Sequence, residues 1–275
     1  MTARVACAQV PLSVGDTAGN RTTCRSAIEE AAGDGAQIVV LPELASSGYV
    51  FADRAELASL AETRDGPAIA EWANLAEALQ ITIVGGFPEA AGDAVYNSAA
   101  VVDPTGLRGV YRKAHLWDSE NPVFDRGDDL PMVVDTEHGR IGVMLCYDIE
   151  FPEWVRAVAL SGADLLCAPV NWPLLPRPAG ERPTEMVRAL AGAGMNRMPI
   201  AVCDRVGVER GQDWVGGSVI VDADGYPMAM AEFGKAGVIT ADVDLEESRV
   251  KRINSHNDVH GDRRTDLYRR TALLD

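Results

Sequence analysis

The stretch that decides the fold is residues 142–153, which read Gly-Val-Met-Leu-Cys-Tyr-Asp-Ile-Glu-Phe-Pro-Glu. The residues ahead of Cys146 are short and apolar, as is typical of a buried strand. Pro152 suits the first position of a helix, and apolar residues recur after it at helical spacing. The pattern therefore predicts a strand over 141–146, a turn, and a helix over 152–161.

Cys146 stands at the turn of this unit. A cysteine in such a place has its sulfur lifted out of the core, near backbone N–H groups and the positive end of a helix, which favour the thiolate. The alternative is a buried structural cysteine, which is the commoner fate of cysteine in proteins. The local pattern supports both interpretations equally, so the rest of the chain has to decide between them.

Apolar strand patterns alternate with helical patterns along the chain, and the second half repeats the order of the first. The repeat is visible locally, because residues 101–106 resemble residues 220–225 and residues 38–43 resemble residues 165–170. Predicted strands cover residues 4–10, 36–41, 81–86, 98–102, 109–112, 141–146, 164–169 and 199–203, and predicted helices cover residues 20–32, 67–79, 152–161 and 183–197.

Two similar halves, each a mixed sheet with helices, bury their apolar sheet faces most simply by packing sheet on sheet. We therefore predict an α/β fold, a four-layer α-β-β-α sandwich built from two pseudo-symmetric halves. Because the halves would share one core, we predict a single domain over residues 1–275, with a polar C-terminal tail over about 246–275. Such a tail often wraps a neighbouring molecule, and it can equally be disordered.

The composition excludes several classes of partner and site. The chain has 275 residues, of which 47% are hydrophobic, and a formal net charge of −16, which argues against nucleic acid and anionic membranes. Its five cysteines contain no CxxC pair, so they suit a reducing compartment better than a disulfide scaffold or a zinc site. We see no signal segment and no apolar run of about 20 residues, and we predict a cytoplasmic protein.

Three polar residues follow apolar strand patterns at the point where each strand ends. Glu43 follows residues 39–42, Lys113 follows residues 109–112, and Cys146 follows residues 143–145. Ligands gather at strand ends in layered α/β sheets, so the three side chains are expected to converge in one crevice. Together they form a coherent set of acid or base, cation and nucleophile.

The chemistry of such a set is specific. A free thiol with a pKa near about 8.5 is only a few per cent thiolate at neutral pH. An ammonium within about 4–6 Å lowers the pKa of its partner by about 1–3, so we expect Lys113 to make Cys146 largely ionised and to hold an oxyanion. Glu43 would act as the general base, deliver the thiol proton to a departing amine and then activate the water that attacks a thioester.

Three ordered motifs resemble the signatures of the nitrilase superfamily, the carbon–nitrogen hydrolases. They are Leu41-Pro42-Glu43, residues 111–116 (Tyr-Arg-Lys-Ala-His-Leu) and residues 145–153 (Leu-Cys-Tyr-Asp-Ile-Glu-Phe-Pro-Glu). The match extends over nearly the whole chain, from the first strand to the hairpin at residues 216–218. One motif would be weak evidence, whereas three in order favour a nucleophilic Cys146 over a structural one.

The resemblance implies an α-β-β-α sandwich and a Glu–Lys–Cys triad, which maps onto Glu43, Lys113 and Cys146. Glu120, seven residues beyond Lys113, matches the second glutamate with which the family positions substrate near the lysine. Chemistry by this triad needs no metal and no organic cofactor. The family also implies a homodimer or a higher homo-oligomer, with the helix at 152–161 and the tail at the interface.

The resemblance extends to candidate pocket residues. The backbone N–H of Tyr147 is placed to join Lys113 in an oxyanion hole. Asn171 and Trp172 fall where the family often lines its pocket, although an ordinary loop with a half-buried tryptophan explains them as well. Tyr49 is a further candidate for the pocket wall, with simple packing as its alternative.

The family contains nitrilases, aliphatic amidases, N-carbamoyl hydrolases and N-acyltransferases, so membership alone does not determine which reaction is catalysed. The absence of a membrane-spanning or synthetase domain disfavours acyltransferases and coupled glutaminases. True nitrilases more often have Trp-Glu where Tyr147-Asp148 follows the cysteine, and residues 113–120 (Lys-Ala-His-Leu-Trp-Asp-Ser-Glu) look most like the amidase branch.

We therefore predict an amidase that hydrolyses small, aliphatic carboxamides to a carboxylic acid and ammonia through a cysteine thioester. N-carbamoyl amide hydrolysis and nitrile hydrolysis are the enzymatic alternatives. The alternative from a different class is a catalytically silent interaction protein on the same fold.

Overall fold

Two six-stranded sheets form the centre of the structure, a computed structural model that describes residues 1–270. In the first sheet, three neighbouring strands run parallel, and the other three pair antiparallel with their neighbours. The strand order is β14 (Gly237–Asp244), β1 (Thr2–Gln9), β2 (Ile38–Val40), β3 (Thr82–Ala91), β4 (Ala94–Asp103) and β5 (Gly106–Arg112).

The second sheet repeats this arrangement of three parallel strands, one antiparallel strand on one side and an antiparallel hairpin on the other. The two halves are therefore pseudo-symmetric, as predicted. The strand order is β13 (Pro227–Met230), β12 (Val219–Val221), β9 (Ile200–Cys203), β8 (Leu165–Pro169), β7 (Gly139–Val143) and β6 (Met132–Thr136). A separate ribbon pairs β10 (Val208–Glu209) with β11 (Gln212–Asp213).

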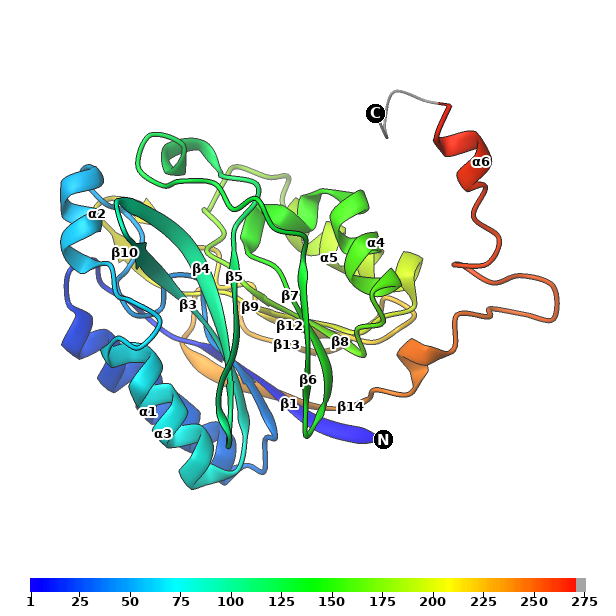
Figure 1. Cartoon of the computed structure of the whole chain (residues 1–275), viewed down its shortest axis with the longest axis horizontal. Coiled ribbons are helices and arrows are strands. Elements are labelled where there is room, and N and C mark those ends of the chain that lie inside the picture. Colours follow the sequence, from blue (N-terminus) through cyan, green and yellow to red (C-terminus); the bar gives the residue numbers. More distant parts are fainter. Residues whose placement is uncertain (271–275) are drawn as a thin grey trace.

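Helices cover the outer face of each sheet (Figure 1). α1 (Thr17–Gly33) and α3 (Pro67–Leu79) pack on the first sheet, and α4 (Pro152–Leu160) and α5 (Thr184–Asn196) pack on the second. Local sequence explains where these helices begin. The Asp16 side chain accepts a hydrogen bond from the backbone N–H of Gly19 and so caps α1. Proline stands in the first turn of both α3 and α4, where its missing N–H is not needed.

The inner faces of the two sheets pack on each other and form the central core. Apolar residues of β1 and β2, such as Val5 and Val40, lie in one cluster with residues of the second sheet, such as Val143 and Leu165. All four of these side chains are fully buried. The predicted four-layer α-β-β-α sandwich is confirmed.

Several elements were not predicted, and most of them lie where burial is incomplete. β14 and β6 are edge strands whose residues are largely half-exposed, so they lack the apolar run of a buried strand. α2 (Arg54–Leu60) buries only Leu57. The strand predicted over 141–146 ends at Val143, because the chain turns into the short 3-10 helix η2 (Cys146–Glu150).

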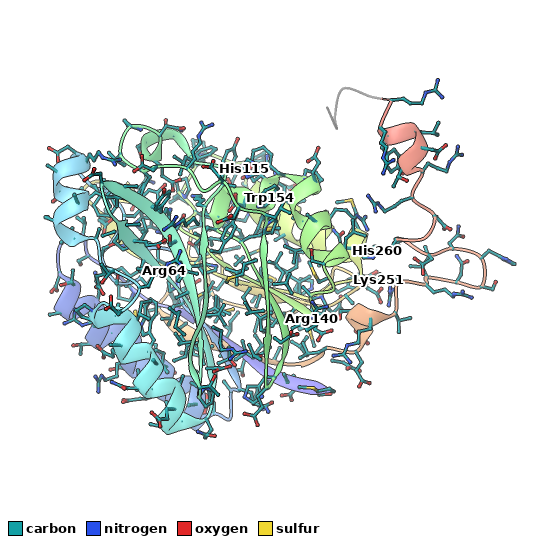
Figure 2. The ribbon with its side chains drawn as sticks, viewed as in Figure 1. Arg64, His115, Arg140, Trp154, Lys251 and His260 are labelled. Carbon is teal, nitrogen blue, oxygen red and sulfur yellow. The ribbon has the colours of Figure 1, made fainter. Side chains whose placement is uncertain are left out.

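The tail leaves the sandwich after β14 and leads to a short helix, α6 (Thr265–Tyr268), which stands apart from the sheets (Figure 1). Lys251 tethers its first part, because its Nζ donates to the carbonyls of Asn196 (3.0 Å) and Arg197 (2.9 Å) at the end of α5. Figure 2 shows Lys251 and His260 at this junction. Residues 271–275 of the predicted tail lie outside the described residues. Within residues 1–270, no helix has the length and apolar character needed to cross a membrane.

Candidate active site

The three polar residues predicted at strand ends meet in one place. Glu43 lies in the turn after β2, Lys113 directly follows β5, and Cys146 begins η2 after β7. The first two belong to one sheet and the third to the other, so the site spans the interface between the halves. The backbone N–H of Lys113 donates to the carbonyl of Asn97 in β4 (2.8 Å), which holds the lysine against the sheet.

The Lys113 ammonium lies between two carboxylates. Its Nζ is 2.8 Å from Glu43 Oε1 and 2.7 Å from Glu120 Oε1, and all three side chains are buried. Burial opposes the charged lysine, but Glu120 and Glu43 outweigh it and hold the pKa of Lys113 well above its usual value. Lys113 is therefore a cation held between two carboxyl groups.

Two neutral side chains complete the polar cluster. Asn97 Nδ2 donates to Glu43 Oε1 (2.8 Å) and lies 3.3 Å from Glu120 Oε1. The Tyr49 hydroxyl donates to Glu120 Oε1 (2.7 Å), and the backbone N–H of Trp117 donates to Glu120 Oε2 (2.8 Å). Four donors thus hold Glu120 in one orientation.

Glu43 differs from Glu120 because one of its oxygens is free of protein contacts. Among the described residues, no hydrogen bond reaches Glu43 Oε2. Burial raises the pKa of Glu43 to about 7, against the opposing effect of the Lys113 ammonium. A carboxyl with a pKa near neutrality and a free oxygen is suited to take up and return a proton.

The protonation state of Cys146 differs from our expectation. Burial and the Glu43 carboxylate raise the pKa of the Cys146 thiol well above its usual value, and Lys113 lowers it by less. The expectation of a largely ionised sulfur was wrong, because burial and the Glu43 carboxylate favour the neutral thiol by more than the Lys113 ammonium favours the thiolate. Cys146 therefore rests as a thiol and needs a base before it can act as a nucleophile.

The backbone of Cys146 is held in an unusual conformation. Its φ of 43° lies in the left-handed region, which non-glycine residues rarely adopt. Strained backbone of this kind persists only when surrounding contacts impose it, and it is common at functional sites. The residue retains 9% exposure, and its Sγ lies 3.8 Å from the carbonyl oxygen of Asn171.

Two hollows flank the cluster and share Trp117 and Pro173 in their walls. The larger is a cavity of about 160 Å³ on the Glu120 side, and its wall combines aromatic side chains with polar ones. The smaller, of about 10 Å³, is lined by Cys146, and it has room for about one water molecule. Besides the shared pair and Glu120, the larger cavity is lined by Tyr49, Val50, Phe51, Asp118, Ser119, Val123, Phe124, Asn171, Gln212 and Trp214.

The other predicted pocket residues also lie at the site. Asn171 follows β8 as Glu43 follows β2, and its Nδ2 donates to the backbone carbonyl of Glu43 (2.9 Å). Trp172 and Tyr147 line the smaller hollow beside Cys146. The pseudo-symmetry of the halves thus places Asn171 against Glu43, because equivalent strand ends face each other across the sheets.

Comparison with known proteins identifies the family. The model of the family described as "Carbon-nitrogen hydrolase" matches residues 4–252. The chain belongs to the carbon–nitrogen hydrolases. A "Nitrilase" from Pyrococcus abyssi is 38% identical over 252 residues, which cover 90% of this chain and 92% of that protein. An "N-carbamoylputrescine amidase" from Solanum lycopersicum is 34% identical, over 94% of this chain and 92% of that protein.

The fold of this carbon–nitrogen hydrolase is shared with an amidase from Nesterenkonia sp. The two structures superpose with a TM-score of 0.80 at 25% identity, over 98% of this chain and 95% of the amidase. Other structures of that amidase are described as belonging to the nitrilase superfamily and as carrying acrylamide added to the active-site cysteine. The resemblance to the nitrilase superfamily and the prediction of an enzyme are confirmed.

Sequence reasoning missed some residues of the carbon–nitrogen hydrolase site. Asn97 is a polar residue inside the apolar run of β4, and a buried polar group in such a strand is the signal that would have marked it. Asp148 lies inside the motif around Cys146, but the sequence does not show that its carboxylate is fully buried beside the site. Trp117 and Trp214 carry no local pattern that separates a cavity wall from ordinary packing.

Proposed function

We propose that this carbon–nitrogen hydrolase is an amidase that converts small, aliphatic carboxamides to the carboxylic acid and ammonia. The observation that carries the proposal is the buried cluster in which the Lys113 ammonium bridges Glu43 and Glu120. Cys146 lies close enough to all three for each to affect the pKa of its thiol. A base, a cation and a nucleophile thus share one small volume.

The chemistry follows from the protonation states. Glu43 takes the thiol proton as Cys146 Sγ bonds to the amide carbon, and the carbonyl oxygen becomes an oxyanion. Lys113 and the backbone N–H of Tyr147 stabilise this oxyanion. Glu43 then gives the proton to the amide nitrogen, ammonia leaves and a thioester remains. A water then loses a proton to Glu43 and adds to the thioester, the carbon–sulfur bond breaks and the acid leaves, and Glu43 returns the proton to the Cys146 sulfur.

The size and character of the cavity support a small substrate. About 160 Å³ lies beside Glu120, and the aromatic side chains in its wall offer contacts to a short apolar acyl chain. Tyr49 and Glu120 form a polar edge of this cavity that can orient the carboxamide group.

A second candidate is the hydrolysis of an N-carbamoyl amine, and one feature favours it. Glu150 and Glu185 line the smaller hollow together with Cys146. A carboxylate beside the nucleophile suits a substrate with a free ammonium, such as the one an N-carbamoyl diamine carries. The relative from Solanum lycopersicum is named for such a compound. Arg188 pairs with Glu150 at 2.9 Å, which leaves Glu185 for this contact.

A screen of ammonia release separates these candidates. Purified protein is supplied with small aliphatic amides, the matching nitriles and N-carbamoyl amines, and carbon dioxide is measured together with ammonia. The proposal predicts ammonia without carbon dioxide, and the highest kcat/KM for short carboxamides. Carbon dioxide in equal amount would favour the carbamoyl hydrolase, and turnover of nitriles alone would favour a nitrilase.

Glu120→Gln is expected to lower kcat by about 10²-fold with a loss of only a few degrees in melting temperature. Glutamine keeps the shape but removes the charge that, with Glu43, holds the Lys113 ammonium. Asp103→Asn is a matched control, because Asp103 is also a buried carboxylate, paired with Arg108 at 3.2 Å far along β4. Equal loss of activity in the two variants would mark Glu120 as structural.

We also propose that the protein forms a homodimer through the helices of the second sheet and the tail. Exposed apolar side chains on α5 and the tail support this surface, and Val187, Met195, Val250 and Ile253 are each at least half exposed. Light scattering is expected to give twice the 29.4 kDa mass of one chain. Truncation after residue 245 is expected to produce a monomer. A full-length chain with the monomer mass would contradict the proposal.

A further inference from the structure

Asp148 is a fully buried carboxylate two residues beyond Cys146. Its Oδ2 accepts hydrogen bonds from the Tyr111 hydroxyl (2.8 Å) and from the backbone N–H of Leu145 (3.2 Å). Its Oδ1 accepts from the backbone N–H of His115 (3.0 Å) and lies 2.7 Å from His115 Nδ1. Because a carboxylate only accepts hydrogen bonds, we assign the ring proton of His115 to Nδ1, so that all four contacts of Asp148 are with donors. None of these partners lines the larger cavity.

These donors belong to the two segments that carry the reacting groups. Residues 111–115 contain Lys113, and residues 145–148 contain Cys146, so one carboxylate joins the lysine segment of the first sheet to the cysteine turn of the second. The network extends into α4, because Trp154 Nε1 donates to the Tyr111 hydroxyl (2.9 Å). The rings of His115 and Trp154 are 5.1 Å apart, and Figure 2 shows the two residues side by side.

We propose that Asp148 is a positioning residue that sets the place of the Cys146 sulfur relative to Lys113. The left-handed backbone at Cys146 needs contacts that impose it, and Asp148 supplies them by closing the turn. Its backbone N–H donates to the carbonyl of Leu145 (2.9 Å), and its side chain accepts from the N–H of the same residue. The proposal rests on Cys146 as the nucleophile of the proposed function.

The substitution Asp148→Asn tests this arrangement because every partner of Asp148 is a donor. Asparagine keeps one acceptor oxygen and presents an NH₂ group in place of the other. If the NH₂ takes the Oδ2 position, it opposes the N–H of Leu145; if it takes the Oδ1 position, it opposes the N–H of His115. A backbone N–H cannot accept a hydrogen bond, so in either orientation the side chain loses its hydrogen bond to the backbone of one of the two segments.

We expect Asp148→Asn to lower kcat by about 10²-fold, the loss that corresponds to a misplacement of about 1 Å. KM is expected to change by less than about 3-fold, because the cavity residues are untouched. Alkylation of Cys146 by iodoacetamide, followed by mass spectrometry, is expected to be slower as well. That second readout needs no knowledge of the natural substrate.

Asp164→Asn is the matched control, because Asp164 is an equally buried carboxylate that also joins distant segments. It accepts from the N–H of Arg140 (3.0 Å) and from Arg249 in the tail (2.8 Å). This variant is expected to lose thermal stability without a loss of kcat. If both variants lose kcat in proportion to their melting temperatures, or if Asp148→Asn keeps the wild-type kcat and alkylation rate, the positioning role is wrong.

Tyr111→Phe covers the case in which Asp148→Asn does not fold. Phenylalanine keeps the volume of the buried ring and removes one donor from Asp148. An intermediate loss of kcat is expected, and a wild-type kcat would overturn the proposal. Full activity of a Cys146→Ala variant would instead refute the proposed function, so the two failures are distinguishable.

Discussion

Replacing Cys146 with alanine is expected to lower amide hydrolysis by about 10⁴-fold or more while the chain stays folded. The sulfur is the atom that would form the thioester, and no neighbouring side chain can take its place. The turn at Cys146 is held by backbone and Asp148 contacts that alanine retains. Ammonia release measures the loss, and circular dichroism melting measures the fold.

Cys167→Ala is the control for this prediction. Cys167 lies on β8 in the core between the sheets, and its thiol is fully buried. Its loss is expected to reduce stability and leave turnover near the wild-type rate. An electrophilic amide analogue should add covalent mass to Cys146 in the wild type and in this control, and not in Cys146→Ala. Hydrolysis by Cys146→Ala near the wild-type rate would require another nucleophile.

Glu43→Gln is expected to reduce kcat/KM by about 10²–10⁴-fold, the usual contribution of a general base. Glutamine cannot accept the thiol proton, and burial leaves Cys146 protonated at neutral pH. Lys113 keeps its ion pair with Glu120, so the variant retains one buried salt bridge and is expected to fold. Both the acylation rate and the rate of Cys146 alkylation are expected to fall. A variant that alkylates at the wild-type rate would show that another group removes the proton.

The same residue sets the expected pH dependence. Burial raises the pKa of Glu43 to about 7, so at lower pH its carboxyl is protonated and cannot act as a base. The wild-type kcat/KM is therefore expected to fall as the pH drops through about 7, and to level off above it. The step near 7 should vanish in Glu43→Gln. The same step in both proteins would assign it to a different group.

Much of the fold could be predicted from local sequence patterns, because the same order of strands and helices occurs in both halves of the chain. Buried strands such as β2 and β8 are uniformly apolar because both of their faces are covered. Helices pack on the outer face of each sheet, and the opposite sheet packs on its inner face. Pro152 marks the start of α4 in the sequence as it does in the structure. The edge strands β6 and β14 could not be predicted in this way, because their half-exposed residues do not form an apolar run.

The sequence by itself determined the alternation of strands and helices, the repeat of the halves and the strand ends where Glu43, Lys113 and Cys146 stand. Only the tertiary structure decided how these groups are charged, because a pKa depends on burial and on charges brought from distant segments. It placed two carboxylates on one lysine and left Cys146 as a thiol. Asn97 acquires its partners from distant segments of the first half of the chain, and Asp148 acquires Tyr111 and His115 only once the two sheets have packed together.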